Sequence, residues 1–289
     1  MKPSERRKQP QPEYQVIPYP KYQRLAAAAA QTMRHKPMIH GLLEVDVTGP
    51  RAALREHKAK TGELLSFTAF LTTCMAKAVE EHRAVQAFHL GRKRLAVFDD
   101  VDIVTRVERE VDGQKVVIPC ILRAANRKTF REQHEEIRAA QVADVRDQMQ
   151  QFRFLPTALF RPFASAIAWI GAFRPRLWKK LIGTVGITSV GMFGSGAGWG
   201  IPASAPTALM VTVGGISQKQ TIVDGRIVTR EYLCLTVSVD HELVDGAPAA
   251  RFTQRLKELI ESGYGLALDA PAAEPEQAMA AAATQRASP

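Results

Sequence analysis

The chain has 289 residues, a formal net charge of +10 and a hydrophobic fraction of 46%. These values are ordinary for a soluble globular protein with one large domain or two small ones. The positive charge alone does not indicate nucleic-acid binding, because the basic residues are scattered along the chain and no zinc-finger or RNA-binding motif accompanies them. We therefore expect no nucleic-acid partner.

The cysteines and the N-terminal residues indicate a reducing compartment. Cys74, Cys120 and Cys234 lie in apolar surroundings, far apart, and no pair has the spacing of metal ligands. Residues 1–11 are polar and rich in proline, unlike a secretory signal. We expect buried free thiols, no metal site and a cytoplasmic protein.

Helical and extended patterns alternate along the chain. Helical periodicity and capping residues predict helices at 21–35, 66–82, 128–150 and 247–262. Runs of β-branched and apolar residues predict strands at 40–47, 95–98, 101–107, 116–122, 184–189, 208–214, 220–228 and 232–239. Asp-Gly pairs at 112–113 and 224–225 predict turns.

The sum of these elements predicts an α+β fold, in which helices back a mixed sheet. Residues 1–15 are expected to form a disordered arm and residues 271–289, which are rich in alanine and proline, a flexible tail. Residues 16–270 are then one folded domain.

A histidine follows the strand predicted at 232–239. His241 lies in the segment Asp240-His-Glu-Leu-Val-Asp-Gly246, directly before the last helix. An imidazole at the end of a buried strand is held by a rigid scaffold, and its pKa near neutrality suits a general base. Asp245 can bind a cation or a backbone group, and Gly246 permits a tight turn. A histidine in this position is also often purely structural, so the motif alone leaves both interpretations open.

Four segments in matching order resemble a known family. They are 40–46 (HGLLEVD), 66–82 with its SFT start and EEH end, 183–194 (GTVGITSVGMFG) and 238–246 (SVDHELVDG). Together they resemble the catalytic domain of the dihydrolipoyl acyltransferases of 2-oxoacid dehydrogenase complexes, relatives of chloramphenicol acetyltransferase. The resemblance covers about residues 15–269 and implies a trimeric, chloramphenicol acetyltransferase-like fold.

The resemblance implies roles for individual residues. His241 matches the base that deprotonates the thiol of coenzyme A or dihydrolipoamide, and Thr188 matches the hydroxyl donor to the tetrahedral oxyanion. Asp245 matches a carboxylate that orders the loop through an ion pair with a cation of the N-terminal segment, for which Arg24 and then Lys21 are the candidates. In the family the site lies between subunits, so Thr188 and His241 are expected to come from different chains. The positions expected to contact coenzyme A are Ser189, Gly246 and Arg24.

The sequence departs from the family in three ways. Glu242 and Ser189 replace the usual arginine after the histidine and the usual asparagine after the threonine. The negative charge beside His241 leaves the acyl donor open. No lipoyl domain precedes the catalytic region, so we expect the acyl group to come from free acyl-coenzyme A or from a separate lipoylated protein.

The third departure is a divergent helical segment at 152–182. It is rich in aromatic and aliphatic residues, interrupted by prolines and flanked by arginines and lysines, so it does not suit a membrane span. Four interpretations remain: a buried core or subunit-interface helix, an oligomer contact, a lid over a long acyl chain, or a peripheral membrane contact.

The function predicted from these observations is acyl transfer between coenzyme A and a thiol such as dihydrolipoamide, by a homotrimer or larger homo-oligomer that carries no lipoyl group of its own. The alternative is a non-catalytic trimeric scaffold or assembly protein that kept the fold.

Overall fold

The computed structural model describes residues 36–91, 93–111, 114–142, 174–191, 196–202 and 205–266. The predicted arm at 1–15, the helix at 21–35 and the tail at 271–289 lie outside these residues, as do residues 152–173 of the divergent segment.

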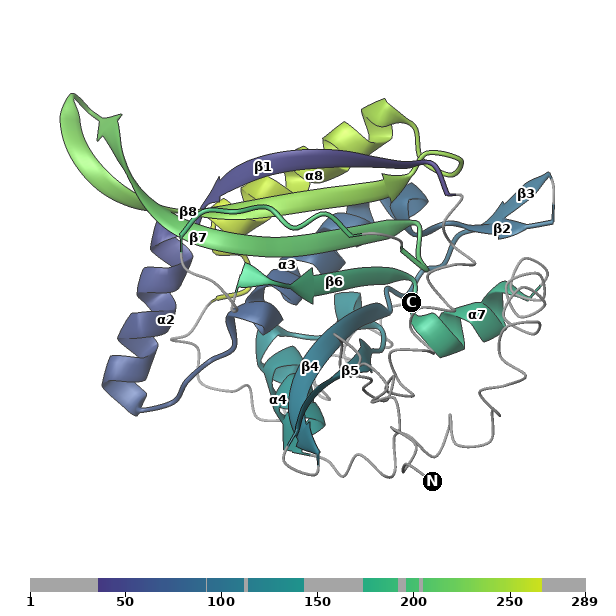
Figure 1. Ribbon diagram of the computed structural model, residues 1–289, viewed down its shortest axis with the longest axis horizontal. Coiled ribbons are helices and arrows are strands. Elements are labelled where there is room, and N and C mark those ends of the chain that lie inside the picture. The colour runs from purple at the N-terminus through teal and green to yellow at the C-terminus, as the bar shows by residue number, and fades with distance from the viewer. Residues whose placement is uncertain are drawn as a thin grey trace, which may run out of the picture.

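One six-stranded mixed sheet forms the centre of the fold (Figure 1). Its strands, in spatial order, are β1 Met38–Asp46, β8 Arg226–Asp240, β7 Leu209–Val223, β6 Val185–Ser189, β4 Ile103–Val111 and β5 Gln114–Leu122. β6 pairs in parallel with both β4 and β7, and the remaining pairs are antiparallel. A separate small hairpin joins β2 Phe88–Leu90 and β3 Arg94–Ala96. The predicted α+β architecture is confirmed.

Helices α3 Phe67–Glu81, α4 Phe130–Val142 and α8 Gly246–Glu261 cover one face of the sheet (Figure 1). Helix α2 Thr48–Thr61 lies at one end, and α7 Pro175–Ile182 lies below the β2–β3 hairpin. Short 3₁₀ turns occur at Arg83–Gln86 and Ala125–Arg127. Among the described residues, no helix has both the length and the apolar character needed to cross a membrane.

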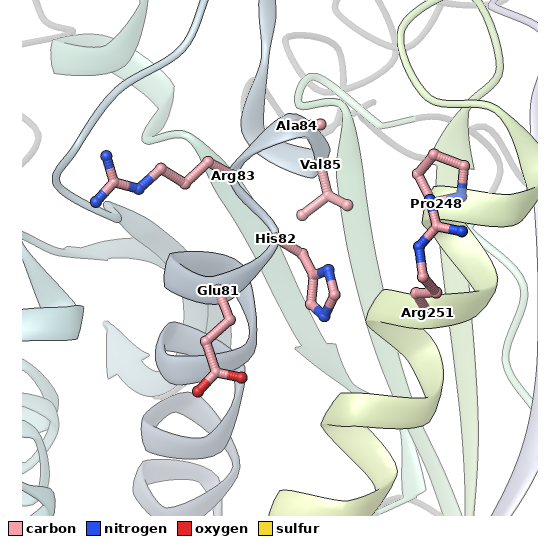
Figure 2. A pocket seen from close by; sticks show the side chains of 7 residues that line it. All are labelled: Glu81, His82, Arg83, Ala84, Val85, Pro248 and Arg251. Atoms are coloured by element: carbon pink, nitrogen blue, oxygen red, sulfur yellow. The ribbon is translucent and has the colours of Figure 1, made fainter.

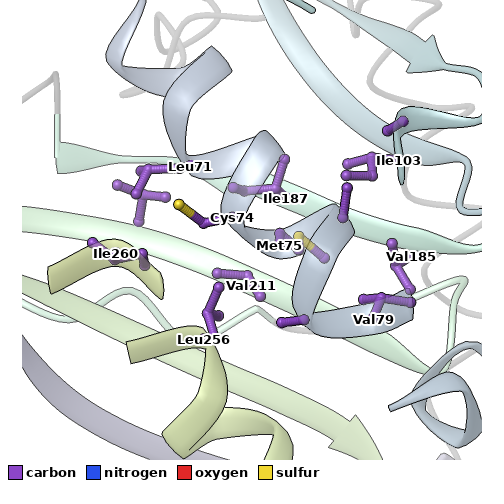
Figure 3. Packing of buried hydrophobic residues seen from close by; sticks show 14 of the residues in the cluster. Leu71, Cys74, Met75, Val79, Ile103, Val185, Ile187, Val211, Leu256 and Ile260 are labelled. Carbon is purple, nitrogen blue, oxygen red and sulfur yellow. The ribbon is translucent and has the colours of Figure 1, made fainter. Parts of the chain in front are cut away.

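The core fills the space between the sheet and these helices. Figure 3 shows Leu71, Cys74 and Met75 of α3 packed over Ile187 and Val211 of the sheet. Leu256 and Ile260 of α8 belong to the same cluster (Figure 3), and Phe252 of this helix is fully buried. Because this face is sealed by helices, the reactive groups must lie at strand ends or on the opposite face.

The long β7–β8 hairpin corrects the sequence prediction. Strands at 208–214, 220–228 and 232–239 were expected, but two continuous strands meet at the turn of Asp224 and Gly225, both with positive φ. The expected break at 215–219 is not present, and the ladder instead has a register shift between Val213 and Ile216. Gly214 and Gly215 carry this bulge, so glycines that resembled a strand end lie within a strand. The pairing of β8 with β1 ends at Tyr232. Between Tyr232 and the turn at Asp224 and Gly225, β8 pairs only with β7.

Ser66 is the N-cap residue of α3 and connects this helix to α4. Its hydroxyl accepts the Ala69 N–H at 3.2 Å, and its own N–H donates to Nδ1 of His134 at 3.0 Å. The ring of His134 is only 5% exposed. Burial first, and then the nearby Arg138 charge, lowers the pKa of His134 from its ordinary value.

This buried imidazole makes stability depend on pH. The unfolded ring takes up a proton near pH 6.5, whereas the folded ring resists it, so the free energy of unfolding should fall as the pH drops below about 6.5. One such proton gives a slope of at most about 1.4 kcal/mol per pH unit. We expect urea unfolding of His134→Gln to show a flatter dependence between about pH 7 and pH 5 than the parent chain. Equal slopes would assign the effect to other groups.

Candidate functional site

His241 lies directly after the last residue of β8. Its backbone N–H donates to the carbonyl of Pro37 at 2.9 Å, which ties the turn to the start of β1. Its side chain is exposed, and no hydrogen bond or ion pair joins the imidazole to another described residue. Within the described part of the chain, His241 is thus held through its backbone and neither ring nitrogen has a partner, so a nitrogen is available to accept a proton.

Asp240 anchors this turn from inside. It is 1% exposed, and its carboxylate lies 3.1 Å from Nζ of Lys36. The carboxylate also accepts the Glu242 N–H at 3.2 Å, and the Asp240 carbonyl accepts the N–H groups of Leu243 and Val244, each at 3.0 Å. Asp240 is a residue of the site that sequence patterns did not predict. A carboxylate at the end of an apolar strand is the signal that marks it, but its partner is two hundred residues away in the chain.

The Lys36–Asp240 pair yields a test of the turn. Removing one partner of a buried pair leaves an uncompensated charge, and the cost is reduced here because Lys36 is partly exposed. We expect Lys36→Met to lower the free energy of unfolding by about 1–3 kcal/mol, and Lys36→Met with Asp240→Asn to recover part of that loss. Urea unfolding of the single and double variants measures the coupling. Additive losses would show that the two groups do not interact.

Asp245 is the N-cap residue of α8, and Gly246 is its first residue. The Asp245 carbonyl accepts the Ala249 N–H at 3.1 Å, while its carboxylate is exposed and makes no capping bond. The carboxylate has no partner among the described residues, and both candidate cations, Arg24 and Lys21, lie outside them. The predicted ion pair therefore stays a prediction.

Glu242, which follows His241, faces the β2–β3 hairpin. One of its carboxylate oxygens lies 3.6 Å from Nε2 of His89, and both side chains are largely exposed. An exposed pair of this kind contributes at most about 1 kcal/mol. The negative charge beside His241 thus has a partner on β2 when His89 is protonated.

Thr188 and Ser189 end β6, and both are half-buried. Thr188 stands in register with Thr212 of β7, which stands in register with Thr236 of β8. The hydroxyls of Thr212 and Thr236 are buried, with no hydrogen-bond partner among the described residues. This row lies on the face of the sheet that carries no described helix.

The register also separates Thr188 from His241 within one chain. His241 is five residues beyond Thr236, about 16 Å along the strand, and two strand spacings add about 10 Å across the sheet. The separation is therefore roughly 19 Å. One chain does not bring the two predicted catalytic side chains together.

Residues 196–202 cross the open face of the sheet. The Gly215 N–H donates to the Gly198 carbonyl, and the Trp199 indole donates to the Leu43 carbonyl at 3.1 Å. Large apolar side chains remain between 42% and 59% exposed on and beside this face: Leu42, Val190, Trp199 and Ile201. An apolar surface of this kind is typical of a protein–protein contact.

A pocket of about 300 Å³ opens between the end of α3 and the first turns of α8 (Figure 2). Figure 2 shows His82 and Arg251 directed into the space between the two helices, while the guanidinium of Arg83 is turned away. Arg83 is paired with Asp99 at 2.6 Å. Neither His241 nor Thr188 lines this pocket. It is thus separate from the predicted catalytic residues.

The C-terminal third of the chain matches a known family. Residues 181–268 match the model described as 2-oxoacid dehydrogenases acyltransferase (catalytic domain), and this range contains both Thr188 and His241. Over 249 residues the chain is 26% identical to the lipoamide acyltransferase component of branched-chain alpha-keto acid dehydrogenase complex from Bacillus subtilis (strain 168), covering 82% of this chain and 50% of that protein. Over 87 residues it is 37% identical to the dihydrolipoyllysine-residue succinyltransferase component of 2-oxoglutarate dehydrogenase complex from Bartonella vinsonii subsp. berkhoffii, covering 30% of this chain and 21% of that protein. The chain spans half or less of the length of these relatives.

Solved structures share the fold. A probable dihydrolipoamide acetyltransferase from Listeria monocytogenes 4b F2365 superposes with a TM-score of 0.64 at 21% identity, covering 90% of this chain and 98% of that one. The cubic core of the pyruvate dehydrogenase multienzyme complex gives 0.62 at 21% identity, covering 88% and 94%. The fold of the described body is therefore that of these proteins.

Proposed function

We propose that this chain transfers an acyl group between coenzyme A and a thiol. The proposal is supported by the fold, which is that of the acyltransferase cores, and by residues 181–268, which match the model of the 2-oxoacid dehydrogenases acyltransferase catalytic domain. The observation that carries this proposal is the state of His241. Its imidazole is exposed, unpaired among the described residues and held at its backbone by Pro37. The matched region contains it together with Thr188.

The proposed chemistry is a thiol–thioester exchange. His241 takes the proton of the attacking thiol, whose ordinary pKa of about 8.5 leaves it mostly protonated near neutral pH. The thiolate adds to the thioester carbonyl, and the Thr188 hydroxyl donates to the resulting oxyanion. Collapse of this intermediate expels the second thiolate, which recovers the proton from the imidazolium. Ser189, Gly246 and Arg24 are proposed to contact coenzyme A, and Asp245 to orient the turn.

The site is proposed to form between chains of a homotrimer. The separation of roughly 19 Å within one chain exceeds any side chain's reach, so Thr188 must serve the His241 of a neighbour. The exposed apolar side chains on the open face of the sheet support such a contact. A reducing compartment is part of the proposal, because Cys74, Cys120 and Cys234 are free and buried.

A turnover assay with several acyl donors distinguishes the proposed enzyme from the alternative, a non-catalytic scaffold. Purified protein is incubated with acetyl-, succinyl- or isobutyryl-coenzyme A and either dihydrolipoamide or a separate lipoylated domain, and the released coenzyme A thiol is followed. Turnover with at least one pair is expected. An assembled oligomer without turnover on any pair, and without a thermal shift from coenzyme A, would favour the scaffold instead.

Mixed oligomers test the site between chains. Thr188→Val and His241→Ala are each expected to lose at least about a hundredfold in rate. After unfolding and refolding together, an interface that combines the intact Thr188 of one chain with the intact His241 of another should work. A random 1:1 mixture should then recover about a quarter of the parent rate, because one interface in four has this pairing. If the rate of the mixture did not exceed the mean rate of the two separate variants, the site would not combine Thr188 and His241 from different chains.

A further inference from the structure

Helix α7 has its leucines on the outside. Leu177 and Leu181 are 42% and 44% exposed, and no residue of the helix is buried. The half-buried side of the helix carries Pro175, Trp178, Lys179 and Ile182, of which only Lys179 is charged. Its ammonium lies 5.0 Å from the centre of the Phe98 ring, donates to the Asp100 carbonyl at 3.1 Å and lies 3.7 Å from the Asp102 carboxylate. Trp178 and Ile182 thus face the body, as the apolar stripe of a surface helix normally does, whereas Leu177 and Leu181 are further apolar residues left on the exposed side.

Polar contacts hold the helix in this orientation. Arg123 donates to the carbonyls of Lys179 and Lys180, at 3.0 and 2.5 Å, and thereby caps the C-terminal end. The same guanidinium is paired with Asp102 at 2.8 Å. Because Arg123 and Lys179 both bind Asp102, a rotation that buried the leucines would break several polar contacts around a buried carboxylate.

Unpaired cations border the two leucines. Arg174, Arg176 and Lys180 are exposed, and none has a carboxylate partner among the described residues. Residues 174–182 contain no aspartate or glutamate. We call the set of Arg174, Arg176, Leu177, Lys180 and Leu181 the α7 face.

The neighbouring hairpin extends this surface. α7 lies against β2, and both occupy the same end of the molecule (Figure 1). Beside them Lys93, Arg94, Leu95 and Val97 are exposed, with the two apolar side chains about half exposed. Exposed cations and aliphatic side chains therefore occur on two adjoining elements.

We propose that the α7 face binds the surface of a membrane that contains anionic lipid. Leucines on a helix with lysine and arginine at its edges match an interface in which phosphate groups lie above hydrocarbon. An acidic protein surface would satisfy the cations but would leave Leu177 and Leu181 without apolar contact. The helix is only two turns long, so the attachment is peripheral and weak, and salt reverses it.

Co-sedimentation of the full chain with vesicles tests this proposal. Binding is expected to vesicles of phosphatidylcholine with phosphatidylserine, to be much weaker with phosphatidylcholine alone, and to fall on addition of salt. Because each cation near an anionic surface contributes about a fivefold gain in partition, Arg174→Gln with Lys180→Gln should reduce binding about twenty-fivefold. The matched control, Lys58→Gln with Arg226→Gln, removes two exposed cations elsewhere and should leave binding unchanged.

The leucines are tested separately. Leu177→Glu with Leu181→Glu should abolish binding without lowering the melting temperature, whereas Leu64→Glu, which changes an exposed leucine between α2 and α3, should keep it. Three results would overturn the proposal: no binding of the parent chain at low salt, a leucine variant that melts well below the parent because the chain itself covers this face, or a variant that changes only the oligomeric state. Acyl transfer is not needed for any of these readouts, so failure here is distinct from failure of the proposed function.

Discussion

Replacing His241 by alanine should lower the rate of acyl transfer by about two to four orders of magnitude, because a positioned general base contributes that much to proton transfer. The fold should be unaffected. The His241 side chain is exposed, its imidazole bonds to no other described residue, and the contact that holds the turn is made by its backbone N–H to Pro37. Steady-state rates with coenzyme A and dihydrolipoamide measure the loss of activity, and the melting temperature shows whether the fold is unaffected.

A matched control uses the nearby histidine. His89 is exposed and lies at the same end of the molecule, next to Glu242, but has no proposed part in proton transfer. His89→Ala should therefore change the rate by no more than a few-fold, consistent with the small contribution of an exposed pair. If His241→Ala kept the parent rate, or if it lost activity only because it unfolded, the proposed base would be wrong.

Gly214→Ala should produce a large loss of stability. A Cβ at this position would overlap the carbonyl oxygen of Gly198 and lie 2.9 Å from the carbonyl oxygen of Cys234. Both are backbone atoms, so no side-chain rotation relieves the contact. We expect the free energy of unfolding to fall by about 3 kcal/mol or more, the upper range for an overpacked core.

Gly41→Ala is the control for this change. Gly41 lies on the edge strand β1, and its nearest contact to an added Cβ is a carbonyl oxygen at 3.9 Å, an ordinary van der Waals distance. Its free energy of unfolding should change by less than about 1 kcal/mol. Urea unfolding compares the two variants. A Gly214→Ala protein as stable as Gly41→Ala would mean that residues 196–202 are not packed against β7.

Local patterns predicted the elements on which the site is built. The apolar run before His241 and the Asp224–Gly225 pair act through neighbouring residues, and they predicted the end of β8 and the turn of the hairpin, while helical periodicity predicted α8. The continuity of β7 and β8 as two long strands was not predicted. Helix α2 was missed, because only Pro50 of its residues is buried and an apolar stripe is therefore weak.

Features that depend on distant contacts were not predictable. The Lys36–Asp240 pair joins residues far apart in sequence, and nothing in either segment indicates the other. The spacing of the residues at 174–182 indicates an amphipathic helix, but periodicity does not tell which side faces inward. The half-buried side carries Trp178, Lys179 and Ile182, and the partners of Lys179, Phe98 and Asp102, belong to a different part of the chain. The distance between Thr188 and His241 likewise follows from strand register alone.

The β7–β8 hairpin continues well past the last residue that pairs with β1. Its distal part has Ile222 and Ile227 more than 70% exposed and contributes nothing to the hydrophobic core. Insertions or deletions near its tip would therefore leave the folding of the body intact, as long as a two-residue turn is kept. The molecule thus carries an appendage whose length can evolve without disturbing the groups that surround His241.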